Sequence, residues 1–120
     1  MIRLVVLVFA TFAVVISAAH AQDQDVYTIG GIAVDEQAAT VAEAQQLAFA
    51  SARLIGAQRL IERFTLPEDR LAATDLIIDQ AVADRMAAAV DVEQEVAGAG
   101  RYRGQLAIVY TPVEVRAILT

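Results

Sequence analysis

The chain has 120 residues, with nine basic and fifteen acidic residues, a formal net charge of −6 and no cysteine. This length corresponds to one domain rather than two, and the acidic balance argues against nucleic acid and anionic lipid as partners, because both carry negative charge. The lack of cysteine excludes disulfides, thiol nucleophiles and a lipid anchor on an amino-terminal cysteine.

The first 21 residues are typical of a secretory signal peptide. Arg3 gives a positive start, residues 4–16 are apolar or small, and Ala19 and Ala21 occupy the two positions that a signal peptidase recognises, which places cleavage before Gln22. The alternative is an uncut anchor in the inner membrane. A membrane-spanning helix needs about 20 apolar residues, and the run is shorter. We therefore expect a periplasmic or secreted protein with no membrane attachment after cleavage.

Cleavage would leave residues 22–120, which we expect to form a single α+β domain. These 99 residues include eight arginines and fifteen acidic residues, a net charge of −7. They contain no Cys, His, Lys, Asn or Trp, because the only histidine is His20, and their one serine is Ser51. A nucleophile needs a base beside it, and a zinc site needs Cys or His. We therefore predict a non-enzymatic chain with no catalytic residues, cofactor or metal.

The first predicted element is a strand over residues 26–29, which are β-branched or aromatic. Gly30 and Gly31 indicate a bulge or kink, residues 32–34 resume the strand, and Asp35 ends it.

A long amphipathic helix is predicted over residues 40–64. Thr40 and Glu43 form a capping box at its start, and Pro67 requires the helix to end before it. Gly56 either marks a close contact or is tolerated at a cost of up to about 1 kcal/mol. The expected buried face comprises the apolar residues at helical spacing, namely Leu47, Ala50, Leu54, Ala57, Ile61 and Phe64, widened by Ala44, Ala48 and Ile55.

A second helix is predicted from Thr74 or Asp75 to about Ala89. Its apolar residues recur every four positions, so the expected buried stripe is Ile78, Val82 and Met86.

A β-hairpin follows, in which a half-buried strand over residues 90–96 is joined to a strand over residues 101–110 by a turn at 97–100. We expect an odd-length loop or a bulge, with either Glu95 and Glu93 opposite Arg101 and Arg103, or Val96 and Val92 opposite Tyr102 and Leu106. The buried face of the second strand is expected to hold Tyr102, Leu106, Ile108 and Tyr110.

A short last helix is predicted from a second capping box, formed by Thr111 and Glu114 with Pro112 at the first helical position. Its apolar residues are Val115, Ile118 and Leu119. The chain then stops at Thr120, directly after an apolar pair, and we expect the natural protein to continue. Together these elements predict an α+β fold: a small antiparallel sheet of about three strands, with one long helix and one or two shorter helices packed on one face.

Two groups of charged residues are candidate sites. The carboxylates of Asp91, Glu93 and Glu95 are expected on one strand face, where they could bind Ca²⁺ or act as general acid and base in a hydrolase. The alternative is a solvated strand face paired with arginines, which we favour. The second group is a candidate interaction surface for another protein, made of Arg53, Arg59, Arg63, Arg101 and Arg103.

Several stretches occur in an order found in a known family. They are Tyr27–Asp35 before an Ala- and Gln-rich helix, then residues 59–65, 90–95 and 101–103, Tyr110, and residues 115–119. In this order they resemble a proteobacterial family of exported proteins called domain of unknown function twenty-sixty-six, over nearly all of residues 22–120. Members of that family are usually longer, with this unit at the amino end. The family has no established catalytic residues, so the resemblance implies none here.

Export and the missing catalytic side chains together favour a non-catalytic module of the periplasm or cell envelope. We expect it to bind an unidentified protein partner there or to act as a scaffold, and not to bind nucleic acid.

Overall fold

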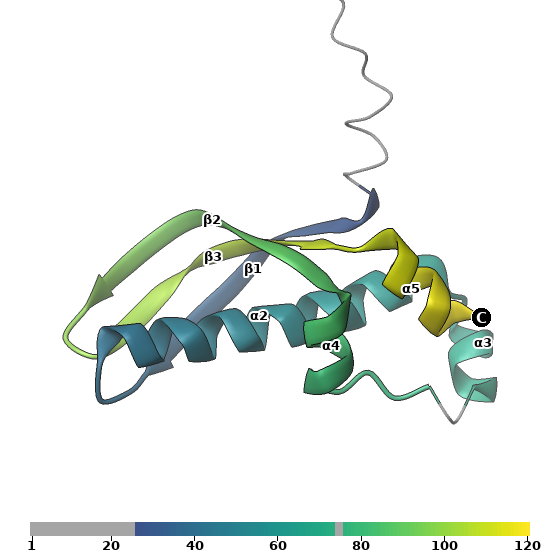
Figure 1. Ribbon diagram of the computed structural model, residues 1–120, viewed down its shortest axis with the longest axis horizontal. Coiled ribbons are helices and arrows are strands. Elements are labelled where there is room, and N and C mark those ends of the chain that lie inside the picture. The colour runs from purple at the N-terminus through teal and green to yellow at the C-terminus, as the bar shows by residue number, and fades with distance from the viewer. Residues whose placement is uncertain (1–25, 74–75) are drawn as a thin grey trace, which may run out of the picture.

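The structure, a computed structural model, describes residues 26–73 and 76–120 (Figure 1). It has an α+β fold, as predicted: a three-stranded antiparallel sheet in the order β1-β3-β2, with helix α2 along one face. The predicted signal peptide lies outside the described residues. The elements are β1 (Thr28–Gln37), α2 (Val41–Phe64), α3 (Pro67–Ala72), α4 (Gln80–Met86), β2 (Ala87–Gly98), β3 (Arg101–Tyr110) and α5 (Pro112–Leu119).

Strand β1 contains the predicted bulge. Ile29 pairs with Ile108 and Ile32 pairs with Leu106, so the register shifts across the two glycines, and Gly31 has a φ of +65° that favours glycine. The predicted end at Asp35 was wrong, because pairing with β3 continues to Gln37.

Helix α2 begins and ends where the sequence predicts. The Thr40 hydroxyl accepts a hydrogen bond from the Glu43 amide at 3.1 Å, which satisfies one of the free donors of the first turn. The predicted buried face was partly wrong, because Leu47 is 49% exposed. The buried residues are mostly small, namely Ala44, Ala48, Ala52, Gly56, Ala57, Leu60 and Ile61. Small side chains let the helix axis approach the sheet closely, so the larger residues flank the contact.

The predicted second helix was wrong in extent. In the described part of that region the structure holds the seven-residue helix α4, whereas the short helix α3 precedes it, and the predicted caps Thr74 and Asp75 lie outside the described residues. Asp79 caps α4, since its Oδ1 accepts from the Val82 amide at 3.0 Å. The helix ends at Met86, whose carbonyl accepts from the Thr111 amide at 2.7 Å, and β2 begins at the next residue. Of the predicted stripe, Met86 is buried, and the other two residues pack partly buried against the core.

The β2–β3 hairpin turns at Ala99 and Gly100, which both have positive φ (51° and 75°) and so form a two-residue turn. Val92 pairs with Leu106, as in one of the two predicted registers. Neither register holds through the hairpin, because Val96 pairs with Arg103 rather than Tyr102, and Glu95 pairs with Gly104 rather than Arg101. The register then shifts between Val92 and Gln94, which leaves Glu93 as a bulge. The predicted buried face of β3 is confirmed, because Tyr102, Leu106, Ile108 and Tyr110 are all buried.

Strand β2 is far more exposed than the sequence predicts. Val92 and Val96 are 44% and 64% exposed. Val92 is exposed because β2 is an edge strand and α2 packs mainly against β1 and β3 (Figure 1), whereas Val96 pairs with Arg103 and lies on the sheet face away from α2. The sequence shows the alternation of β2 but does not show how far the helix layer reaches.

Helix α5 forms as predicted and buries Val115. The predicted capping box at its start was wrong for Thr111, because the Thr111 side chain makes no hydrogen bond to the first turn of the helix. The Thr111 carbonyl instead accepts from the Val115 amide at 3.1 Å. No helix within residues 26–73 and 76–120 is both long and apolar enough to cross a membrane.

Candidate functional site

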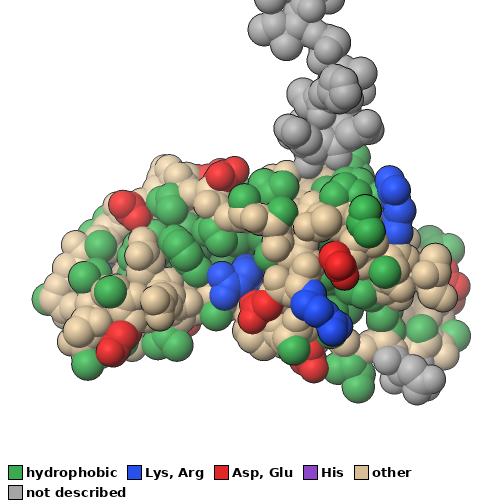
Figure 2. All heavy atoms as spheres, in the orientation of Figure 1, with side chains coloured by type: hydrophobic (Ala, Val, Ile, Leu, Met, Phe, Trp, Pro, Cys, Tyr) green, Lys and Arg blue, Asp and Glu red, His purple; other side chains and the backbone are tan. Residues whose placement is uncertain are grey.

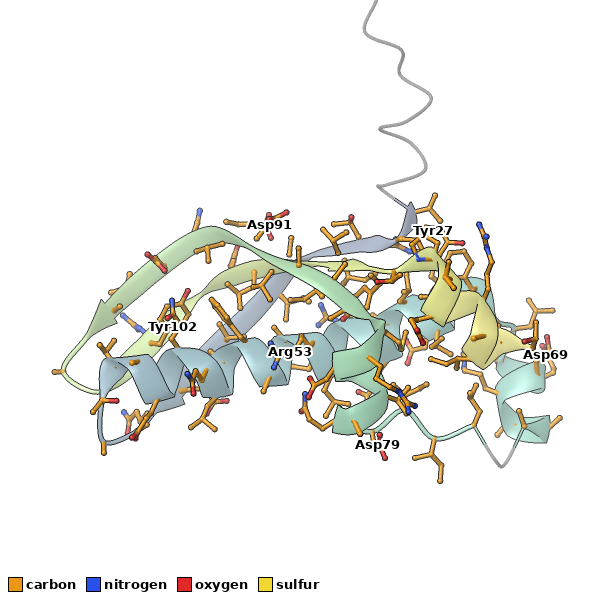
Figure 3. All side chains as sticks on the ribbon, in the orientation of Figure 1. Tyr27, Arg53, Asp69, Asp79, Asp91 and Tyr102 are labelled. Atoms are coloured by element: carbon orange, nitrogen blue, oxygen red, sulfur yellow. The ribbon has the colours of Figure 1, made fainter. Side chains whose placement is uncertain are left out.

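The three predicted carboxylates do not share a strand face. Asp91 pairs with Ala107 and points away from α2, whereas Glu95 pairs with Gly104, on the face that Tyr102 turns toward α2 (Figure 3). The extra residue at the Glu93 bulge reverses the alternation between Asp91 and Glu95. The prediction of one acidic face was therefore wrong.

Two of these carboxylates are held by hydrogen bonds inside the domain. Glu93 Oε1 accepts from the Gly31 amide at 2.6 Å, which joins the bulges of the two edge strands across β3. Glu95 Oε2 accepts from the buried Tyr102 hydroxyl at 2.9 Å. Burial and the Glu95 carboxylate both raise the pKa of Tyr102, so it stays a neutral donor. Within the described part of the chain, no three acidic side chains are grouped so that they could hold a metal ion.

Arg53 and Arg101 of the predicted interaction surface form ion pairs. Arg53 Nε donates to Asp84 at 2.8 Å and links α2 to α4. Arg101 binds Asp35 with two bonds of 2.9 and 2.7 Å and links β3 to β1. Hydrogen bonds from these arginines lower the pKa of both aspartates. Both arginines therefore have structural contacts inside the domain.

The five arginines do not gather on one patch. Arg63 donates to the Val26 and Thr28 carbonyls at 3.0 and 3.3 Å, which fixes the end of α2 to the start of β1. Arg101 lies near the start of α2, because the neighbouring Gly100 carbonyl accepts from the Ala38 amide. The two ends of this 24-residue helix are about 36 Å apart. Arg59 and Arg103 are exposed.

The sequence did not reveal the open edge of β2. At the end of β3, the Tyr110 amide donates to the Tyr27 carbonyl just before β1, whereas the next amide, that of Thr111, donates to the Met86 carbonyl just before β2. Successive β3 residues therefore direct their backbone groups alternately to β1 and to β2. A β2 residue bonds to β3 only where its paired β3 residue is one that is directed to β2. The backbone amide and carbonyl groups that point outward, away from β3, include those of Val90, Val92, Glu95 and Ala97. Outward donors and acceptors of this kind can pair with another strand.

Beside this edge, an apolar surface lies between β2 and α2. Figure 2 shows hydrophobic side chains gathered there. We call Phe49, Val90 and Val92 the β2 strip. Phe49 and Val90 pack partly buried against the core, Val92 is 44% exposed, and the Phe49 ring meets Tyr102 edge-on with centroids 5.9 Å apart. An exposed apolar surface beside unpaired backbone is a candidate protein interface.

Two of the hollows formed by the described residues lie away from the β2 strip. One, of about 570 Å³, is on the outer face of the sheet and is lined partly by Asp35, Gln94 and Arg103. The other, of about 420 Å³, lies where α5 meets the end of α2 and is lined partly by Phe64 and Ile118. The first hollow also includes Glu95, but neither hollow includes Val90 or Val92.

No protein-family model matches the chain, and neither a curated protein nor a solved structure matches it. The resemblance to domain of unknown function twenty-sixty-six therefore stays a prediction.

Proposed function

We propose that this chain is an exported, non-catalytic module of the cell envelope that binds another protein through the β2 edge and the β2 strip. The observation that carries the proposal is the 12-residue edge strand, whose outward backbone groups lie directly beside exposed apolar side chains. Backbone bonding together with apolar burial is the usual basis on which a sheet edge recognises an extended segment.

The other parts of the proposal rest on the sequence. The apolar start before Gln22 supports export, and residues 22–120 lack the Cys, His and Lys that most covalent or acid–base mechanisms use. The carboxylates of Glu93 and Glu95 already accept hydrogen bonds within the domain. These observations support a binding role rather than a catalytic one.

Replacing one exposed valine tests the proposed surface. The full chain would be expressed with a tag in its own host, and the size of its native complex would be measured in an envelope extract. Val92→Asp places a charge in the β2 strip. Val113→Asp is the matched control, because Val113 is a 69% exposed valine on α5. We expect the wild type and Val113→Asp to run as a complex and Val92→Asp to run as the free chain.

Two results would contradict the proposal. A wild-type chain that runs free in the extract would argue against a protein-binding function. A complex that survives Val92→Asp but not Val113→Asp would place the interface on another surface.

A further inference from the structure

The Glu93 bulge divides the open edge of β2 into two short regular stretches. Because the register shifts between Ala87 and Ala89 and again between Val92 and Gln94, residues 94–98 pair without interruption on one side of the bulge, and residues 89–92, which carry the valines of the β2 strip, do so on the other. Within the latter stretch, Val90 and Val92 direct their amide and carbonyl groups outward. A partner strand that pairs here would therefore have about three to four residues in register.

The side chains of a partner strand would alternate between two different environments. Residues opposite Val90 and Val92 would lie on the α2 side, on the β2 strip. The residue between them would lie on the outer side beside Asp91, which points away from α2 (Figure 3). The two partner residues opposite Val90 and Val92 are therefore favoured to be apolar. The partner residue between them is favoured to carry a group that complements the Asp91 carboxylate.

The charge of β2 identifies that central group as a cation. Strand β2 contains Asp91, Glu93 and Glu95 and no basic residue. The hydrogen-bond donors to Glu93 and Glu95 are a backbone amide and a phenol, which are neutral. The ion pairs found within residues 26–73 and 76–120 are formed by Arg53 and Arg101, and neither involves β2.

A second copy of this chain fits the edge poorly. Antiparallel pairing of β2 with its own copy would bring two acidic strands together, and like charges on neighbouring strands are destabilising. An extended segment that carries Arg or Lys instead gains from the same charges.

We propose that the β2 edge binds an extended segment of a partner protein in which one basic residue stands between two apolar residues, and that this segment adds as a fourth strand beside Val90–Val92. This inference rests on the protein-binding function proposed above and specifies the chemistry of the partner. The basic residue pairs with Asp91, and its apolar neighbours cover the β2 strip.

A charge-swap titration tests this pairing. The probe is the blocked peptide Thr-Val-Arg-Val-Thr, added to the isotope-labelled chain as purified from its host and followed by amide NMR shifts. We expect the largest shifts at Val90 and Val92. In Asp91→Arg, binding of this peptide should weaken at least tenfold, while the matched peptide Thr-Val-Glu-Val-Thr should bind the variant and not the wild type.

Two controls separate strand addition from general attraction of charges. Glu68→Arg makes the same change in charge at an exposed acidic residue of α3, and it should leave peptide binding unchanged. A form of the arginine peptide with N-methyl groups on its bonding edge keeps the charge but loses its backbone donors, and it should not bind. Equal binding of the arginine peptide to wild type and Asp91→Arg, retained binding of the methylated peptide, or shifts centred away from Val90 and Val92 would overturn the inference.

The native complex distinguishes failure of this inference from failure of the proposed function. A complex lost in Val92→Asp but unchanged in Asp91→Arg would support the binding function and overturn the basic-strand partner. Loss in both variants, with Glu68→Arg unaffected, would support both.

Discussion

The Tyr110 hydroxyl occupies the space that Gly56 leaves open on helix α2. It donates a 2.7 Å hydrogen bond to the Arg53 carbonyl, and a Cβ on Gly56 would overlap the phenol oxygen. Tyr110 is buried at the end of β3. Because Gly56 has no side chain, α2 can approach β3 closely enough for this hydrogen bond to form. Arg53 in turn links α2 to α4 through Asp84.

We predict that Gly56→Ala destabilises the domain by about 1–3 kcal/mol, the usual range for overpacking a core, although alanine favours helix by up to about 1 kcal/mol over glycine. Urea denaturation of wild type, Gly56→Ala, Tyr110→Phe and the double variant measures the coupling. Tyr110→Phe alone should cost about 1 kcal/mol for the lost hydrogen bond. In the double variant the removed hydroxyl relieves the overlap, so the two costs should be less than additive. Simple additivity would contradict a contact between these residues.

Gly104 has a comparable role opposite the β2 bulge. A Cβ there would overlap the Gln94 carbonyl and lie 3.2 Å from Glu95 Cα, and these are backbone atoms that cannot rotate away. We predict that Gly104→Ala lowers the free energy of unfolding by about 2 kcal/mol or more, by the overpacking argument. Gly98→Ala is the matched control in the same hairpin, because a Cβ there meets nothing within 4 Å, and its effect should stay within about 0.5 kcal/mol. Equal effects of the two substitutions in a denaturation series would show that the close approach at Gly104 has no energetic importance.

The hairpin turn holds an unfavourable residue. Ala99 has a φ of 51°, in the left-handed region that asparagine tolerates better than alanine, and Gly100 follows it. We predict that Ala99→Asn, which creates the preferred Asn-Gly turn, raises the thermal midpoint and stabilises the domain by about 1 kcal/mol, since the left-handed conformation costs most residues about 1–2 kcal/mol and asparagine less. Ala97→Asn serves as the control, because Ala97 precedes the turn in β2. A higher midpoint for Ala97→Asn than for Ala99→Asn would argue against the two-residue turn.

The elements that the sequence predicts best are those whose signals are local. The Thr40 cap, the end of α2 before Pro67, the glycine bulge of β1 and the alternation of β3 all follow from neighbouring residues. The extent of α4 was not predictable in the same way, because the pairing of Ala87 with Tyr110 ends the helix.

The candidate site was harder to predict because it depends on long-range pairing. The Glu93 bulge separates three acidic residues that simple alternation places on one face, and nothing adjacent to Glu93 shows where Gly31 will lie. The open edge depends on strand order, which the chain does not encode locally. The partners of Arg53 and Arg63 are likewise 31 or more residues away in sequence.

Alkaline pH should destabilise the domain through its tyrosines. Burial raises the pKa of Tyr110 well above its ordinary value, and burial with the Glu95 carboxylate raises that of Tyr102. A raised folded-state pKa gives stability that is complete below the unfolded pKa, about 10, and is lost as the pH rises above it. The chain has neither lysine nor cysteine, so little else titrates there. We expect the urea midpoint to fall above about pH 10, and to fall less steeply in Tyr110→Phe. Parallel curves for the two proteins would contradict the prediction.

Export makes a prediction about the native chain that is independent of the fold. If signal peptidase cleaves after Ala21, the protein recovered from the envelope fraction of its host begins at Gln22, and its intact mass lacks the first 21 residues. Ala21→Pro should block cleavage without altering residues 22–120, since a proline at this position is incompatible with the small-residue site. Mass spectrometry and amino-terminal sequencing of wild type and Ala21→Pro check this outcome. A wild-type chain that retains Met1–Ala21 in the membrane fraction would instead support the uncut anchor.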